Sequence, residues 1–289
     1  DVPSKGNTEG IFGYGTTASG GSGDWTNLIS NVGVVATDVT GVGTARHAPA
    51  ATQFGGDKGI FGYGHNDSSG VSMTNLVSNT GVVASDTTGV GTARHRRAAC
   101  SYGDDKGIFG YGSGLSAVTN LVSNAGVVAS DTTGVGTARQ LLSACEYGGD
   151  KGIFGFGEST YSMTNLVSNA GVVATDVTGV GTGRSGSAAC SYGGDKGIFG
   201  FGHDGSYVSM SNLVSNAGVV ASDTTGVGSD RTYLAACEFG GGKGIFGYGR
   251  TSGDTNASIT NLVSNAGVVA SDTTGVGTAR GYLAACSFA

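Results

Sequence analysis

The side chains in this sequence that are best suited to chemistry are four histidines, His47, His65, His95 and His203. A neutral imidazole is a common ligand of zinc and related metals, so a cluster of histidines would indicate a metal site. These four are far apart along the chain, and no two have the short spacing that places two ligands on one strand or helix. We therefore expect isolated, solvated histidines and no metal site.

A second candidate set is an aspartate that recurs in six segments of the form (Ser/Thr)-Asp-(Thr/Val)-Thr-Gly. Repeated carboxylates are suitable ligands for Ca²⁺. An Asx turn at the end of a strand explains the same residues with fewer assumptions, so we expect turns. We also expect the arginine that follows each segment to pair with an aspartate across the junction between two units. The aspartates are Asp38, Asp86, Asp131, Asp176, Asp223 and Asp272, and the arginines are Arg46, Arg94, Arg139, Arg184, Arg231 and Arg280.

Acid and base catalysis would need carboxyl groups that occur in one copy only. Glu158, Asp204 and Asp254 are such residues, and a glycoside hydrolase needs a pair of them in one pocket. All three stand in loop segments among Ser and Gly, with nothing that marks a dry pocket. We expect no catalytic residue and no cofactor, and a hydrolase is the least favoured of the functions considered.

These residues are carried by a sequence repeat. The segment x-Gly-Ile-Phe-Gly-(Tyr/Phe)-Gly occurs six times, with its Ile at positions 11, 60, 108, 153, 198 and 245, so the unit is 45–49 residues long. The unit is rich in Gly and β-branched residues and has no helical periodicity, which predicts an all-β protein. Because the repeat runs from end to end without a linker, we predict one domain over residues 1–289.

Four strands are predicted in each unit, as the last copy shows. They are Leu234–Phe239, Lys243–Gly249, Thr260–Asn265 and Val268–Asp272, with Gly-rich or Ser-Asn-x-Gly turns between hairpin partners. Four short antiparallel strands in each of six units predict a six-bladed β-propeller. The sequence begins just before a second strand and finishes just after a first strand, so we expect strands from both termini to complete one blade and close the ring.

The first strand of each unit carries small residues, typically Ala-Ala-Cys, which suits the strand nearest a narrow axis. The third position is Cys in five units and Thr52 in the sixth. A cysteine that is interchangeable with threonine predicts a small buried residue and not a disulfide partner. The cysteines therefore do not indicate whether the protein works in an oxidising or a reducing compartment. The cysteines are Cys100, Cys145, Cys190, Cys237 and Cys286.

The order of an arginine, a small-residue strand, a glycine pair, an aromatic strand ending in Gly-x-Gly and a later aspartate resembles the kelch repeat over the whole chain. Gly62-Tyr63-Gly64 stands near the glycine doublet of that family, and Arg94 stands at its arginine position. The tryptophan of the family is missing, since Trp25 instead precedes a predicted third strand. The repeats also look like the Gly-rich kelch-like repeats of phage tail, other virion-associated and environmental bacterial proteins. The resemblance implies a propeller with an adhesive or structural role.

Two segments differ between the copies while the rest stays nearly constant. The first follows Gly-x-Gly, at 16–25, 65–73, 113–118, 158–163, 203–210 and 250–259, and the second follows the arginine. In a propeller both emerge on one face, so the variation indicates a binding surface, although unconstrained drift of the loops is the alternative. We expect a ligand-binding face formed by Trp25, His47, His65, His95, Arg96, Arg97, Tyr161, His203, Tyr207, Tyr233, Arg250 and Tyr282.

Composition limits the partners. Only 12% of the residues are charged and the formal net charge is −6, which disfavours nucleic acid. The apolar runs are too short to cross a bilayer and Asp1–Lys5 has no signal-peptide core, so we expect a soluble chain or a processed mature form, without membrane insertion.

Exposed tyrosines suit a glycan or a surface protein as the ligand. We expect a non-enzymatic binding or adhesion module in an extracellular or virion-associated setting. The alternative is an architectural subunit that assembles with itself or with other virion proteins into a filament or particle.

Overall fold

The structure is a computed structural model that describes residues 6–158 and 161–289. The described residues form short strands joined by turns and loops, with no α-helix among them, so the protein is all-β. No helix in this part of the chain is long and apolar enough to span a membrane. Asp1–Lys5, where we expect no signal-peptide core, and positions 159 and 160 of the variable segment 158–163 lie outside the described residues.

Within the described ranges, the strands form six three-stranded antiparallel sheets and one two-stranded ribbon, which is β17 (Arg250–Thr251) with β18 (Thr255–Asn256). Written from first to third strand, the sheets are β20 (Ala284–Phe288), β1 (Glu9–Gly13) and β2 (Thr26–Ile29); β3 (Ala50–Phe54), β4 (Lys58–His65) and β5 (Gly70–Val77); β6 (Ala98–Tyr102), β7 (Lys106–Gly110) and β8 (Thr119–Val122); β9 (Ser143–Tyr147), β10 (Lys151–Gly155) and β11 (Thr164–Val167); β12 (Ala188–Tyr192), β13 (Lys196–His203) and β14 (Tyr207–Val214); and β15 (Ala235–Phe239), β16 (Lys243–Gly247) and β19 (Thr260–Val263).

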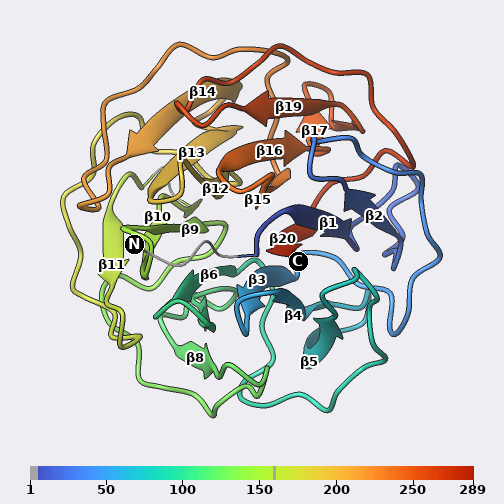
Figure 1. Cartoon of the computed structure of the whole chain (residues 1–289), viewed down its shortest axis with the longest axis vertical. Helices are drawn as coiled ribbons and strands as arrows, with labels where there is room; N and C mark the ends of the chain where they lie inside the picture. The colour runs from blue at the N-terminus through green and yellow to red at the C-terminus, as the bar shows by residue number, and fades with distance from the viewer. Residues whose placement is uncertain (1–5, 159–160) are drawn as a thin grey trace.

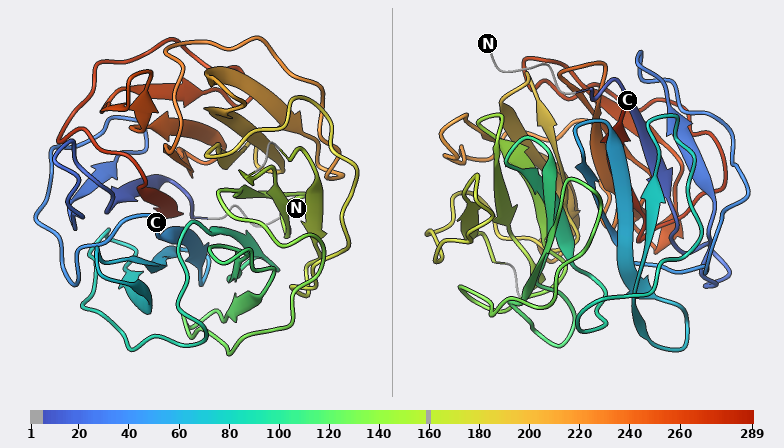
Figure 2. Two further views of the ribbon diagram at one scale, coloured as in Figure 1. Left: turned by 180° about the vertical axis from the view of Figure 1, so that it is seen from behind. Right: turned by 60° about the horizontal axis from the view of Figure 1, so that its bottom comes forward.

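The sheets are arranged around a common axis, with the first strand of each sheet innermost (Figure 1). Each first strand contacts the first strand of the next sheet, and β15 contacts β20. The first sheet combines the two ends of the described chain, because β1 pairs with β20 as well as with β2. The side view shows loops at both ends of the sheets (Figure 2). This architecture of repeated small antiparallel sheets is compatible with a β-propeller.

The predicted fourth strand is a correction to the sequence analysis. The segment Val268–Asp272 contains no continuous strand. Isolated bridges, Val263 with Val269 and Thr260 with Thr273, hold the outer chain to β19, together with the Ala270 N–H, which donates to the Leu262 carbonyl at 2.8 Å. The reason is that side chains replace part of the ladder, since the amide of Asn261 donates to the Ala270 carbonyl and to the Asp272 carboxylate. Each sheet therefore has three strands and an outer segment that is held by isolated bridges and single hydrogen bonds.

Aromatic rings fill the layer between neighbouring sheets. The aromatic residue of each Gly-x-Gly has a positive φ of +61° to +65°, which L-residues rarely adopt and which turns its ring inward. Each ring meets the edge of the Phe in the adjacent sheet at 5.1–5.2 Å, as Tyr63 does with Phe109. The first glycine of each Gly-x-Gly allows this close approach. A Cβ on Gly155, for example, would lie 2.7 Å from the ring of Phe199 in the next sheet.

Each cysteine thiol packs into this layer, against a glycine of the next sheet. A Cβ on Gly152 would lie 2.5 Å from the Cys100 sulfur of the preceding sheet, so glycine and thiol fit against each other. Alternation along β6 then turns Ala99 and Ser101 toward the axial cavity. All five cysteines are buried and free, as the sequence predicted.

Candidate functional site

The two variable segments of a copy lie side by side. A backbone bridge joins the residue after Gly-x-Gly to the residue that follows the arginine, as in the pairs His65 with His47 and His203 with Ser185. In both pairs the N–H and C=O groups are exchanged at 2.9–3.0 Å. The bridges therefore bring the two variable segments together, and a common ligand-binding face stays a prediction.

The second variable segments form a series of backbone hydrogen bonds around the axis. One residue in each segment has a φ between +48° and +62°, and its N–H donates to the carbonyl of the equivalent residue in the preceding sheet at 2.7–3.1 Å. The series returns to its start, because Ala48 donates to Tyr282. These bonds hold the backbone in one conformation while the side chains differ. The members are Ala48, Arg96, Leu141, Gly186, Tyr233 and Tyr282.

Two tyrosines stack beside a shallow cavity of about 90 Å³ at the centre of this series. The rings of Tyr233 and Tyr282 have centroids 3.9 Å apart and an interplanar angle of 17°. Burial raises the pKa of Tyr282, and its contact with the Tyr233 hydroxyl raises it further. The pair is a flat and pre-ordered aromatic surface of the kind that binds sugars or protein side chains.

Polar groups extend this pair outward. The Arg250 guanidinium lies 5.1 Å from the ring centroid of Tyr282, and its Nη1 lies 3.9 Å from a carboxylate oxygen of Asp254. Tyr207 donates a hydrogen bond of 2.6 Å to the same oxygen, and that bond to an anion raises the pKa of Tyr207 to about 12. His203 packs against Tyr207, with ring centroids 5.4 Å apart.

The histidines are the main correction at this face. We expected them to be isolated, but the ring centroids of His47 and His65 are 5.1 Å apart, and those of His65 and His95 are also 5.1 Å apart. His47 is in turn 6.2 Å from Tyr282. The expectation failed because it used spacing along the chain, whereas a bridge and a junction between neighbouring sheets bring these residues together. We call the series from His95 through His65, His47 and Tyr282 to Tyr233 the central arc.

Two residues that the sequence analysis did not select complete the histidine cluster. The Ser22 hydroxyl donates to Asp67 Oδ1 at 2.6 Å and lies 2.9 Å from His47 Nδ1. Asp67 Oδ1 is itself 3.4 Å from His47 Nδ1, and the Asp67 N–H donates to His65 Nδ1 at 3.1 Å. One nitrogen, Nδ1, of each of these two imidazoles therefore faces the Asp67 loop.

The surroundings lower the pKa values of His47 and His95. Burial lowers the pKa of His47, and the neighbouring His65 lowers it further, while Asp67 acts in the opposite direction. Burial and the charge of Arg96 lower the pKa of His95 to about 4. Both imidazoles are thus unprotonated near neutral pH, which is the form that binds metal ions.

The other predicted site residues have different surroundings. Trp25 stands just before β2, where its ring covers Gly23, and Tyr161 stands half-buried before β11. Neither makes a ring contact with the central arc among the residues that the structure describes. Arg96 belongs to the axial hydrogen-bond series, whereas Arg97 is only 4% exposed and is not available as a surface ligand group.

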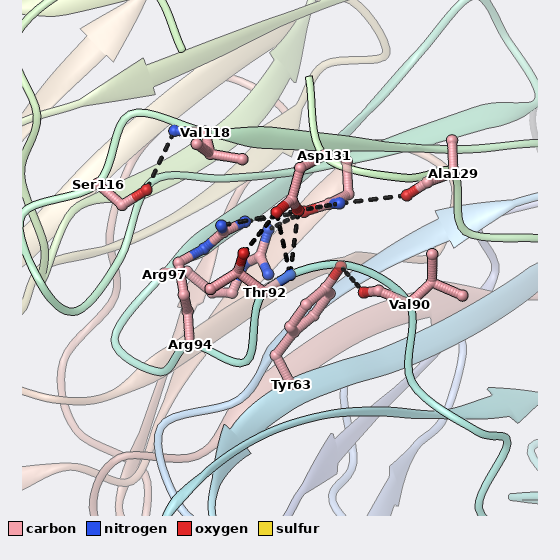
Figure 3. A network of polar contacts seen from close by, with 10 residues as sticks. Tyr63, Val90, Thr92, Arg94, Arg97, Ser116, Val118, Ala129 and Asp131 are labelled. Atoms are coloured by element: carbon pink, nitrogen blue, oxygen red, sulfur yellow. Dashed lines mark hydrogen bonds and ion pairs between the residues drawn. The ribbon is translucent and has the colours of Figure 1, made fainter. Parts of the chain in front are cut away.

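Arg97 is buried because it replaces an arginine of the repeat. Its guanidinium lies 3.6 Å from the ring centroid of Tyr63, and it shares the side-chain oxygen of Asn120 with Arg94, at 3.2 and 2.8 Å. Figure 3 shows the two arginines converging beside Asp131. Burial lowers the pKa of Arg97 to about 9, and its Nε and Nη1 have no hydrogen-bond partner in the part of the chain that the structure describes.

The repeated aspartates have protein partners. Asp176 accepts hydrogen bonds from the N–H and hydroxyl of Thr137 at 2.9 and 2.6 Å and from Asn165 at 2.8 Å, and Arg139 lies 3.9 Å away. Five of the six arginines pair in this way across a sheet junction, as expected. These bonds, between elements of neighbouring sheets, give the aspartates a structural role.

The three carboxyl groups considered for hydrolysis have separate local partners. Glu158 accepts a hydrogen bond from Gln140, and Asp204 caps its own turn by accepting from the Ser206 N–H at 3.0 Å. Asp254 is engaged by Tyr207, as described above.

Sequence reasoning missed Ser22, Asp67 and the axial hydrogen-bond series. Asp67 lies inside the first variable segment and two residues after a histidine, which is the only signal that pointed to it. Ser22 is one serine among many in a Gly-rich loop, and nothing in the sequence marks it. No protein-family model and no curated protein matches this chain.

Proposed function

We propose that the chain is a six-bladed, kelch-like β-propeller that acts as a non-enzymatic recognition module. The ring of contacts between first strands, the pairing of β1 with β20 and the returning series of axial hydrogen bonds support closure. A closed ring would hold the variable segments on a rigid base, which lowers the entropic cost of binding.

The observation that carries the proposal is the stacked pair of Tyr233 and Tyr282 at the axis. The equivalent residues in other sheets include Ala48 and Gly186, so the scaffold does not require an aromatic residue at this position. Two aromatic rings placed beside a cavity, with Arg250 at their edge, favour a glycan or a protein side chain as the ligand. We place the module in an extracellular or virion-associated setting, where such ligands are displayed.

A glycan-array and surface-protein binding screen on the purified protein tests this function. The double variant Tyr233→Ala and Tyr282→Ala places alanine at both positions, as another sheet has at Ala48. It should keep the fold and no longer bind the ligand. Lys196→Ser is the control and should bind normally, because Lys196 is the first residue of β13 and lies at the other end of that strand from His203. A ligand that both variants bind equally well would exclude the tyrosine pair as its site.

One observation favours the alternative, an architectural subunit. An equivalent valine is 64–66% exposed in every copy, which forms a repeated apolar feature on the outer segments. If the protein binds nothing in the screen and sediments as large regular assemblies, the architectural function replaces recognition. The valines are Val34, Val82, Val127, Val172, Val219 and Val268.

A further inference from the structure

We propose that His47, His65 and Asp67 bind a divalent transition-metal ion of the zinc class on the variable face. One ligand atom from each of these residues lies within 4.8 Å of the other two. Two imidazole nitrogens and one carboxylate oxygen are a donor set typical of Zn²⁺ sites that keep an open position. The inference does not depend on the recognition function, because it rests on a different group of residues from the tyrosine pair.

The backbone already sets the positions of the ligands. His47 and His65 are a hydrogen-bonded pair across a bridge, with both N–H to O distances at 2.9 Å, so their Cα positions are fixed. Asp67 is in the turn that follows β4, with a φ of +69°. Zinc ligands bind at about 2.0–2.2 Å, so rotation of side chains that are already this close is sufficient to bring the three atoms to one ion.

Ser22 supplies the support that metal-binding carboxylates usually have. Its N–H donates to Asp67 Oδ2 at 3.0 Å and its hydroxyl donates to Oδ1 at 2.6 Å. Because both bonds come from a different sheet, they fix the carboxylate against the two rings. Such outer hydrogen bonds orient a ligand and raise its affinity for the metal.

Two charged residues, Asp67 and Arg96, act on a cation at this cluster in opposite directions. Asp67 is the anion of the cluster, and its hydrogen bonds from Ser22 lower its pKa, so it stays ionised. Arg96 opposes a cation, since its charge lowers the pKa of both His47 and His95. A bound ion would have two protein nitrogens, one oxygen and a water, with His95 next to the open side.

Other copies of the repeat show which substitutions the fold accepts at the ligand positions. His47 is Ser185 in another copy and His65 is Ser113, so His47→Ser and His65→Ser install residues that the fold already accepts. His203 stands at the end of β13, as His65 stands at the end of β4, but its bridge partner is a serine. His203→Ser therefore removes a histidine from the same position in a different sheet and is the control.

Isothermal titration with ZnCl₂ measures the affinity, and the visible absorption of Co²⁺ reports the geometry. We expect one equivalent to bind, at least tenfold weaker binding in His47→Ser and in His65→Ser, and unchanged binding in His203→Ser. Zn²⁺ should also raise the melting temperature of the wild type more than that of His65→Ser. A cooperative melting transition of each variant without Zn²⁺ shows that the variant is folded. Absence of saturable binding, an unchanged affinity in both serine variants or an equal loss in His203→Ser would overturn the site.

Discussion

The guanidinium of Arg97 lies over the ring of Tyr63, at 3.6 Å, in the position that an arginine three residues earlier occupies in the other sheets. In those sheets Arg46, Arg139, Arg184, Arg231 and Arg280 lie 4.0–4.8 Å from the equivalent ring. This one sheet therefore buries two guanidinium groups where the others bury one. Two like charges that share the single acceptor Asn120 are costly, since each needs hydrogen bonds that are not available.

Arg97→Leu should stabilise the protein. Leucine is present at the same position in other copies, as Leu142, Leu234 and Leu283, and is buried there. Without the second charge, the Arg94 guanidinium can pack over the ring of Tyr63 as the equivalent arginines do in other sheets. We therefore expect a gain of about 1–2 kcal/mol in the free energy of unfolding. Urea denaturation measures it. A loss of stability would mean that Arg97 contributes more through its contact with Tyr63 than its burial costs.

Arg139→Ala should destabilise the protein strongly. Arg139 is fully buried and donates to the Phe156 and Thr137 carbonyls and to Asn165, at 2.8, 3.1 and 2.7 Å. The variant leaves these acceptors unpaired and opens a cavity beside Tyr111, so we expect a loss of about 3–5 kcal/mol.

The control for this variant is Arg250→Ala, because Arg250 is partly exposed and its ion pair with Asp254 is 3.9 Å long. A pair of that kind contributes at most about 1 kcal/mol. Equal effects of the two substitutions on the urea midpoint would contradict a structural role for the buried arginines.

The sequence predicted the repeated sheets well, because the Ile-Phe strand and its glycines recur with a constant pattern. It overpredicted the outer strand, since Val268-Val269-Ala270 has strand composition but the Asn261 side chain donates to the Ala270 carbonyl there in place of a ladder bond. The candidate site was predicted less well. Which residues meet at a junction between sheets depends on how neighbouring sheets pack, and no spacing along the chain encodes the approach of His95 to His65.

Acid should weaken the fold through the six repeated aspartates. Burial raises the pKa of each, but hydrogen bonds from a Thr or Ser and from an Asn, together with a nearby Arg, outweigh it and lower the pKa. Below the unfolded value of about 3.9 the unfolded chain binds more protons than the folded one. Stability is therefore complete above that pH and falls as the pH drops through the folded values.

Melting temperatures measured from about pH 6 down to about pH 2 test this dependence. Asp176→Asn removes one of the six titrating groups and should lower stability at neutral pH while making the curve less steep. A flat profile in the wild type across the range would show that these hydrogen bonds do not favour the ionised carboxylates.

The five cysteines should resist alkylation in the folded protein. Each thiol is at most 4% exposed, and burial raises its pKa, in Cys286 to about 12, so the reactive thiolate is scarce at pH 8. Iodoacetamide should modify none of the five within hours in buffer and all five in urea, as counted by mass spectrometry. Because Cys100 packs against Gly152 of the next sheet, modification needs that junction to open. Rapid labelling of one cysteine in buffer would locate a junction that opens on its own, and labelling of all five would contradict the close packing of the sheets.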